Sequence, residues 1–124
     1  MTFTELFNAD VRIQRDIPYL ADSAEPRHRL DLYAPPNAEN LPVVIYFYGG
    51  GWRSGDKRLF EHLGRAFAVR GIVAATVNYR LTPAVQHPAH ADDCAQAVRW
   101  VHQHISQFGG NPNSLFLMGH SAGA

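Results

Sequence analysis

Three unbroken apolar segments constrain the fold of this chain more than any other feature. They read VVIYFY at residues 43–48, IVAATV at 72–77 and LFLM at 115–118. A strand with one face in water alternates apolar and polar residues, whereas a strand covered on both faces is apolar throughout. The three segments therefore predict buried strands of a parallel sheet with helices over both of its faces.

Two amphipathic patterns between these strands predict the helices. Asp56 can cap the first helix, and Gly71 follows its end. The second begins after Pro88 and carries Asp92 and Asp93 in its first turn, where negative charge is favoured. Their apolar stripes consist of Phe60, Leu63 and Phe67 in the first helix, and of Ala91, Cys94, Ala95, Val98, Val101 and Ile105 in the second.

Two earlier segments, residues 11–20 and 28–36, alternate instead. In the second of them, Leu30 and Leu32 fall on one side, and Arg29, Asp31 and Tyr33 on the other. This period of two predicts an antiparallel pair with one face in water. The predicted order is β-β-β-α-β-α-β, which indicates an α/β fold in one domain over residues 1–124: a mostly parallel sheet with an antiparallel start.

Composition excludes several classes of function. An apolar share of 46% with 18% charged residues is typical of a soluble globular domain. The 11 basic and 11 acidic side chains balance, so nothing favours nucleic acid as a partner. No apolar run approaches the length that spans a bilayer, and the first ten residues do not resemble a secretory signal. With Cys94 as the only cysteine, we expect a cytoplasmic protein.

The most chemical motif is G-x-S-x-G at residues 119–123, directly after the last apolar segment. Such a turn between a strand and a helix presents a nucleophilic serine, here Ser121. The flanking glycines leave room for a strained backbone, and the amide of Ala122 can face the developing oxyanion. The motif alone is weak, but its place after a buried strand strengthens it.

A second motif, YGGGWRSGDK at residues 48–57, follows the first buried strand. Its glycines can turn their amides outward, so Gly49 and Gly50 are candidate oxyanion donors alongside Ala122. A plain connecting loop is the alternative. A phosphate-binding loop is rejected because Asp56 stands where that motif requires lysine.

Several segments together resemble the hormone-sensitive-lipase-like and feruloyl-esterase-like carboxylesterases of the α/β-hydrolase fold, including their kynurenine-formamidase-like branch. The matching segments are LDLYAP, YGGGW with SGDK, VNYRLTP, HPAHADDCAQAVRWV and FGGNPNSLFLMGHSAGA. The resemblance implies Ser121 as nucleophile of an ester hydrolase, Gly49, Gly50 and Ala122 as its oxyanion hole, an acyl-enzyme, and neither metal nor cofactor. It also implies that the chain is the amino-terminal portion of that fold, truncated at the nucleophile elbow, with the triad Asp or Glu and the His beyond residue 124.

One position departs from the family pattern: Tyr48 stands where the glycine loop usually opens with histidine. A tyrosine can fix the loop differently or point into the substrate cleft, so Tyr48 is a candidate cleft residue. Trp52 is a second candidate because it follows the glycine loop, with a packing role as the alternative. We interpret the seven histidines as solvated or packing residues and expect Asp93 to pair with Arg80.

The resemblance leaves alternatives open. We expect the chain to hydrolyse small esters weakly or not at all by itself. An amidase or formamidase would use the same serine chemistry. A non-catalytic fragment would instead associate through its exposed last strand, with a second copy or with a complementing carboxyl-terminal half.

Overall fold

A single mixed sheet forms the centre of the molecule, with strand order β1-β2-β4-β3-β5. The computed structural model describes all residues, 1–124. The strands are β1 (Arg12–Pro18), β2 (Arg29–Ala34), β3 (Leu41–Phe47), β4 (Val73–Val77) and β5 (Gly110–Gly119). The helices are α1 (Phe3–Asn8), α2 (Glu61–Ala68) and α3 (Ala89–His104), with short 3-10 turns η1 (Lys57–Phe60), η2 (Ile105–Phe108) and η3 (Ser121–Gly123).

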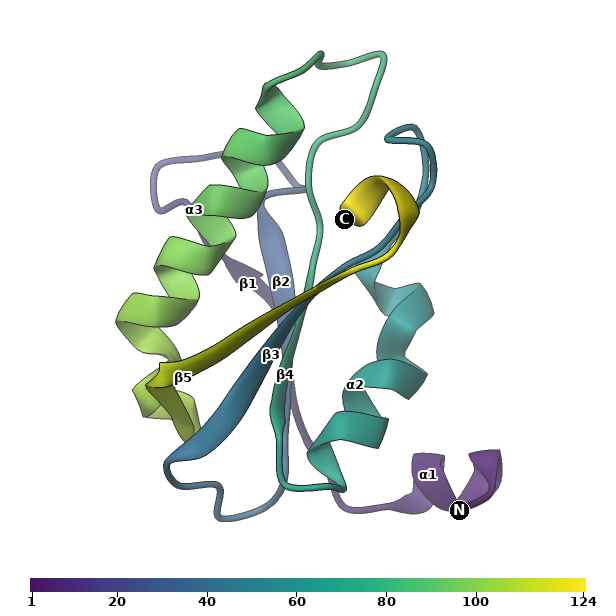
Figure 1. The fold of residues 1–124 in the computed structure, drawn as a ribbon, viewed down its shortest axis with the longest axis vertical. Coiled ribbons are helices and arrows are strands. Elements are labelled where there is room, and N and C mark those ends of the chain that lie inside the picture. The colour runs from purple at the N-terminus through teal and green to yellow at the C-terminus, as the bar shows by residue number, and fades with distance from the viewer.

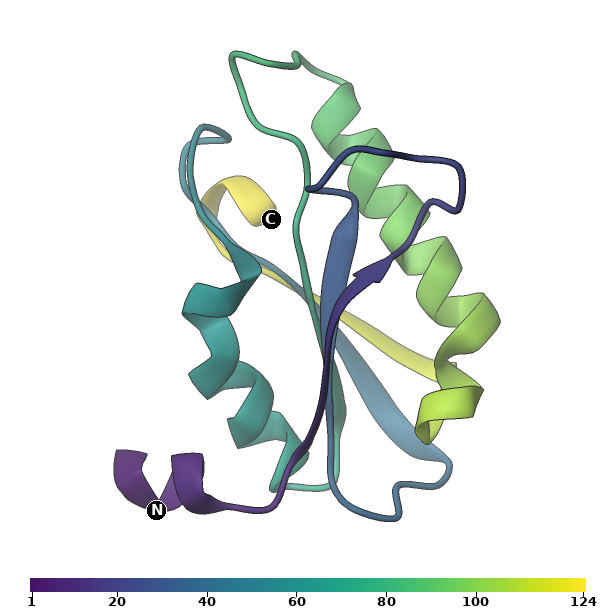
Figure 2. The same cartoon turned by 180° about the vertical axis from the view of Figure 1, so that it is seen from behind.

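The sheet is parallel where the apolar segments lie and antiparallel at its start, as the sequence predicts. β3 pairs in parallel with both β4 and β5, while β2 pairs antiparallel with β1 and β4. α2 and α3 cover opposite faces of the sheet (Figures 1 and 2). The short helix α1 was not predicted; it begins at a capping box in which Thr2 and Glu5 satisfy each other's backbone amides.

The larger core lies between α3 and the sheet. Val43 and Ile45 of β3 meet Ala97 and Val101 of α3 there, all fully buried. A smaller apolar cluster on the other face joins α2 to Tyr33, Val44 and Ala74. No helix in the structure is both long and apolar enough to cross a bilayer.

One expectation about β2 is wrong. Its second face was predicted to be in water, yet Asp31 and Tyr33 are both 0% exposed. The reason is the close approach of α2, in which Gly64 packs on the Tyr33 ring so tightly that a Cβ there would overlap it. β2 is therefore buried on both faces over most of its length. Its polar residue Asp31 lies beneath α2 and meets buried partners rather than solvent.

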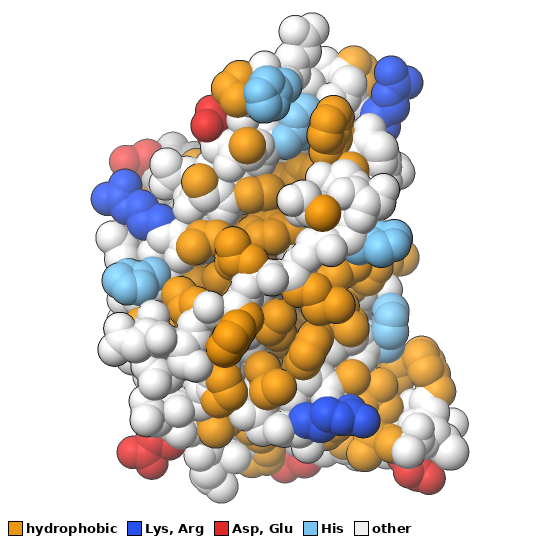
Figure 3. Space-filling model, in the orientation of Figure 1, with side chains coloured by type: hydrophobic (Ala, Val, Ile, Leu, Met, Phe, Trp, Pro, Cys, Tyr) orange, Lys and Arg blue, Asp and Glu red, His pale blue; other side chains and the backbone are white.

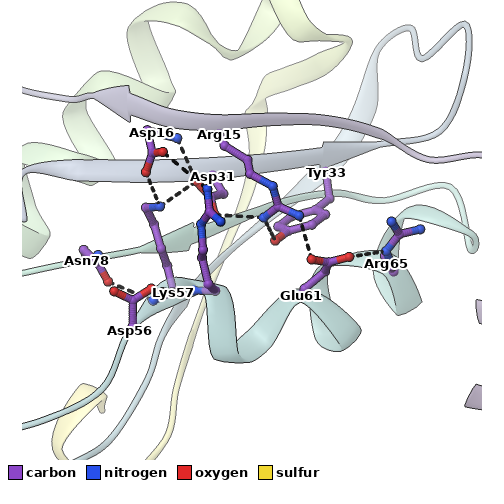
Figure 4. A network of polar contacts seen from close by, with 10 residues as sticks. Arg15, Asp16, Asp31, Tyr33, Asp56, Lys57, Glu61, Arg65 and Asn78 are labelled. Atoms are coloured by element: carbon purple, nitrogen blue, oxygen red, sulfur yellow. Dashed lines mark hydrogen bonds and ion pairs between the residues drawn. The ribbon is translucent and has the colours of Figure 1, made fainter. Parts of the chain in front are cut away.

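The buried polar side of β2 is held by a chain of ion pairs (Figure 4). Lys57, only 2% exposed, lies 2.8 Å from Asp31 and 2.6 Å from Asp16. Arg15 pairs with Glu61 of α2 at 2.6 Å. These contacts tie the first two strands to η1 and α2 and give the buried carboxylate of Asp31 cationic partners.

β5 forms one edge of the sheet, where it pairs only with β3. Phe116 and Leu117 point to opposite faces and are 61% and 63% exposed, and Met118 is 40% exposed. Figure 3 shows apolar side chains gathered over this face of the molecule. The last strand therefore presents apolar side chains together with an unpaired backbone edge.

Candidate active site

Ser121 lies in a strained turn at the carboxyl end of β5. Its φ is +52°, in the left-handed region that side chains other than glycine rarely adopt. The residues that follow Ser121 pack against the start of the glycine loop, so closely that a Cβ on Gly123 would overlap the Phe47 carbonyl. Because backbone strain of this kind persists only where the surroundings enforce it, we infer that the packing around the turn holds Ser121 in this conformation.

The glycine loop passes directly beside this turn. A Cβ on Gly49 would lie 2.7 Å from the His120 carbonyl oxygen and 2.9 Å from Ser121 Cβ. The two backbones are also joined where the His120 amide donates to the Phe47 carbonyl at 3.2 Å. Residues 72 positions apart therefore meet at neighbouring strand ends, and only glycine fits at position 49.

Gly50 occupies a different position in the same loop. Its φ is +149°, and its carbonyl accepts hydrogen bonds from the amides of Arg53 at 3.1 Å and Ser54 at 3.2 Å. These bonds close a tight turn after Gly49. The turn shapes the part of the loop that faces Ser121.

Trp52 connects the loop to two other segments. Its indole Nε1 donates to the Ala122 carbonyl at 2.9 Å, and its own carbonyl accepts from the Thr82 amide at 2.7 Å. Its ring stacks on His90 at 5.7 Å. Trp52 thus links the glycine loop, the serine turn and the segment that leads into α3.

An apolar cavity of about 550 Å³ opens next to the serine turn. Trp52 lines it, as expected of a cleft residue, and so do Cys94 and Val98 of α3 and Leu117 of β5. Cys94 packs against the larger core, and burial raises the pKa of its thiol to about 12, which disfavours the thiolate form. The cavity reaches Ala122 but not the Ser121 side chain, so it adjoins the turn rather than surrounding the hydroxyl.

Tyr48 does not line this cavity, which corrects the alternative that it points into a substrate cleft. Its side chain is 0% exposed and stacks between Phe60, at 5.5 Å, and Tyr79, at 5.1 Å. Its hydroxyl contacts Arg27 and Asn78 on the side of the sheet that α2 covers. The sequence motif places Tyr48 beside the glycines, but the pleat of β3 turns it away from Ser121.

The expected ion pair between Asp93 and Arg80 is present. The Arg80 guanidinium and backbone amide both donate to the carboxylate at 2.9 Å, and His28 contacts it at 2.9 Å. Burial opposes ionisation of Asp93, but the hydrogen bonds from Arg80 and then His28 lower its pKa. This buried cluster anchors the start of α3 and does not reach Ser121.

The Ser121 hydroxyl makes no hydrogen bond to another protein group. His120 is the N-cap residue of η3, but its side chain makes no capping hydrogen bond. No group of three His, Cys, Asp or Glu side chains is arranged to hold a metal ion. Sequence reasoning missed Arg27 and Asn78, whose contacts with Tyr48 span 21 and 30 residues. Asn78 lies in the VNYRLTP segment, which was the available signal for it.

Comparison with known proteins finds similar esterases. Residues 30–124 match the BD-FAE family. A probable isoprenylcysteine alpha-carbonyl methylesterase of Arabidopsis thaliana is 41% identical over 125 residues, which cover 100% of this chain and 28% of the relative. Carboxylesterase NlhH of Mycobacterium tuberculosis is 40% identical over 94 residues, covering 74% of this chain and 30% of the relative. The chain thus spans under a third of the length of these two relatives.

Solved structures show the same arrangement of strands and helices. Esterase B of Lactobacillus rhamnosis superimposes with a TM-score of 0.86 at 30% identity, covering 98% of this chain and 40% of that one. An esterase of Pyrobaculum calidifontis gives a TM-score of 0.81 at 28% identity, covering 98% of this chain and 39% of that one.

Proposed function

The chain belongs to the BD-FAE family and has the α/β-hydrolase fold of its esterase relatives, and from that premise we propose that it carries the nucleophile and oxyanion hole of a serine carboxylesterase. The observation that supports this most directly is the approach of Gly49 to Ser121. A triglycine loop beside a serine with φ of +52° supports an acyl-transfer site of this kind.

In the proposed reaction, Ser121 Oγ attacks the carbonyl carbon of a small-molecule ester and gives its proton to a general base. The amides of Gly49, Gly50 and Ala122 hold the oxyanion of the tetrahedral intermediate. The alkoxide leaves as an alcohol after taking up that proton, and water then hydrolyses the acyl-serine. The family order of the triad puts the acidic residue and the histidine base after residue 124 in a whole enzyme.

Because the family order of the triad puts the general base outside residues 1–124, we expect the 124-residue chain alone to turn over p-nitrophenyl acetate feebly or not at all. General-base help from a triad is worth several orders of magnitude in rate. Robust turnover that Ser121→Ala abolishes would contradict this expectation.

A fluorophosphonate probe tests the nucleophile itself. We expect a single slow adduct by intact-mass spectrometry, located on Ser121 and absent from Ser121→Ala. Imidazole supplied in solution should speed its formation, because it can act as general base beside the proposed oxyanion hole. Adducts that persist in Ser121→Ala, or no acceleration by imidazole beyond that of a denatured control, would refute the proposal.

The exposed edge of the sheet supports a second candidate function, association of the chain with a further polypeptide. β5 offers unpaired backbone groups together with Phe116, Leu117 and Met118, and such an edge accepts another strand. We expect size-exclusion chromatography with light scattering to show a dimer or larger species, or binding of a separately supplied carboxyl-terminal half. A stable monomer at high concentration that binds no such half would contradict it.

A further inference from the structure

The hydroxyl of Tyr48 sits at the centre of a buried network just before the glycine loop. It receives a hydrogen bond from Arg27 Nη2 at 2.6 Å and donates to Asn78 Oδ1 at 2.6 Å. The Tyr48 ring is 0% exposed, and Asn78 is 5% exposed. A buried polar group with both of its bonds made resists displacement, because breaking either bond leaves an unpaired atom away from water.

Arg27 joins the two ends of the loop through one planar group. Its Nη2 also donates to the Gly55 carbonyl at 2.8 Å, while Nε donates to the Tyr79 carbonyl at 2.8 Å. Tyr48 precedes the triglycine segment and Gly55 follows its turn, so a single guanidinium spans the loop. The rigid fork of arginine can make these bonds together, whereas a lysine ammonium offers no such planar geometry.

Two further bonds fix the backbone that flanks the loop. Asn78 Oδ1 accepts from the Lys57 amide at 2.8 Å, and Tyr79 Oη donates to the Tyr48 carbonyl at 2.7 Å. The chain is therefore held immediately before Gly49 and again two residues after Gly55. Between these points, the Gly50 carbonyl accepts the hydrogen bonds that form within the loop. The donors are the amides of Arg53 and Ser54 and the Ser54 hydroxyl.

We propose that Arg27, acting through Tyr48 and Asn78, is a positioning residue that holds the glycine loop with Gly49 against Ser121. None of the three touches the reacting atoms, and their effect passes through the backbone of residues 48–55. The catalytic consequence rests on the proposed function, but the positioning of the loop does not.

Two variants with matched controls test this proposal. Arg27→Gln removes the fork, and Tyr48→Phe removes only the hydroxyl. The controls are Arg99→Gln, on the exposed face of α3, and Tyr46→Phe, which lies in the same tyrosine cluster but has a hydroxyl outside the network. All four are made in the 124-residue protein, and its thermal unfolding is measured for each.

The first readout is amide hydrogen exchange at Arg53 and Ser54, whose bonds to Gly50 report on the loop. We expect exchange about tenfold faster in Arg27→Gln and Tyr48→Phe, and unchanged in both controls. The second is fluorophosphonate labelling of Ser121 with imidazole present. We expect the rate at saturating probe to fall about tenfold or more, with little change in the half-saturating concentration, because a shifted loop impairs the reaction more than binding.

The outcomes separate the two proposals. If wild-type Ser121 does not react, the proposed function fails and hydrogen exchange alone decides the role of Arg27. If Arg27→Gln exchanges and reacts like Arg99→Gln, the positioning role is refuted. If Arg27→Gln does not fold, Tyr48→Phe decides the question, and behaviour identical to that of Tyr46→Phe refutes the proposal.

Discussion

The glycine loop can approach Ser121 only because position 49 has no side chain. The β3 strand end and the serine turn come so close that any Cβ at position 49 would press on His120 and Ser121. The backbone at Gly49 needs no left-handed φ, so the demand for glycine there is one of space. Gly51 is the reverse case: its φ is +61°, but a Cβ would meet nothing within 4 Å.

Gly49→Ala is therefore expected to reduce the labelling rate of Ser121 by about 100-fold, because the loop must move away from the serine. Fluorophosphonate labelling followed by mass spectrometry measures this effect. Gly51→Ala is the matched control: it carries a left-handed φ penalty of about 1 kcal/mol in stability but should label like the wild type. Equal labelling rates in the two variants would show that the close approach has no chemical role.

Asp93 gives a prediction about pH. Its folded-state pKa is lowered, so its contribution to stability is complete above the unfolded value of about 4 and is lost as the pH falls through the folded value. The free energy of unfolding should decrease below about pH 4, and less steeply in Asp93→Asn. At neutral pH we expect Asp93→Asn to be destabilised by about 3 kcal/mol, because Arg80 and His28 lose a buried anion.

Urea unfolding across this pH range measures both effects. Asp92→Asn is the control, since Asp92 is exposed on the first turn of α3 and should change stability by under about 0.5 kcal/mol. An Asp93→Asn variant with wild-type acid sensitivity would rule out the assigned role.

The β2 strand and its cover of η1 and α2 act as one unit. Lys57 Nζ lies 2.8 Å from the fully buried carboxylate of Asp31, and the Lys57 backbone amide also anchors the exit of the glycine loop. Packing and ion pairs on this face therefore bear on the position of the glycine loop. That link arises from η1, which follows the loop without a break.

Lys57→Met should lower the free energy of unfolding by roughly 3–5 kcal/mol, because it leaves the buried carboxylate of Asp31 with the Asp16 amide and with Arg15, at 3.5 Å, as its one remaining cationic partner. Arg58→Met is the matched control. Arg58 is 58% exposed, and its 3.6 Å pair with Asp16 should contribute under about 1 kcal/mol. Urea unfolding of both variants decides the matter, and equal stabilities would mean that Asp31 is neutralised in another way.

At the scale of the whole molecule, the two edge strands of the sheet, β1 and β5, differ in how much apolar surface they expose. β1 alternates between exposed and half-buried residues, whereas β5 carries three large apolar side chains in water. Natural sheets rarely leave such an edge uncovered. The apolar cavity between α3 and β5 continues the same surface, which supports the proposed association with a further polypeptide.

We expect Phe116→Lys to shift the protein toward monomer without loss of stability, since its ring is mostly in water. Light scattering over a concentration series measures the shift. Leu59→Lys is the control, because Leu59 is 67% exposed but stands apart from the β5 edge. Equal association of the two variants would place the contact surface elsewhere.

Much of this arrangement follows from local sequence. Unbroken apolar segments predict β3, β4 and β5, Asp56 marks the start of η1, and Pro88 marks the start of α3. The serine motif after β5 and the glycines after β3 had to converge once the two strands were parallel neighbours. These features depend on periodicity and on residues close in sequence, which is why they can be read without coordinates.

Only the tertiary structure decided the second face of β2, the direction of Tyr48 and the partners of Arg27. Each depends on which helix covers which side of the sheet, and Asp31 looked like a solvent-facing residue until Lys57 and α2 were placed over it. Burial and pairing between residues tens of positions apart leave no periodic trace in the sequence, because a polar side chain alternates in the same way whether it meets water or a buried partner.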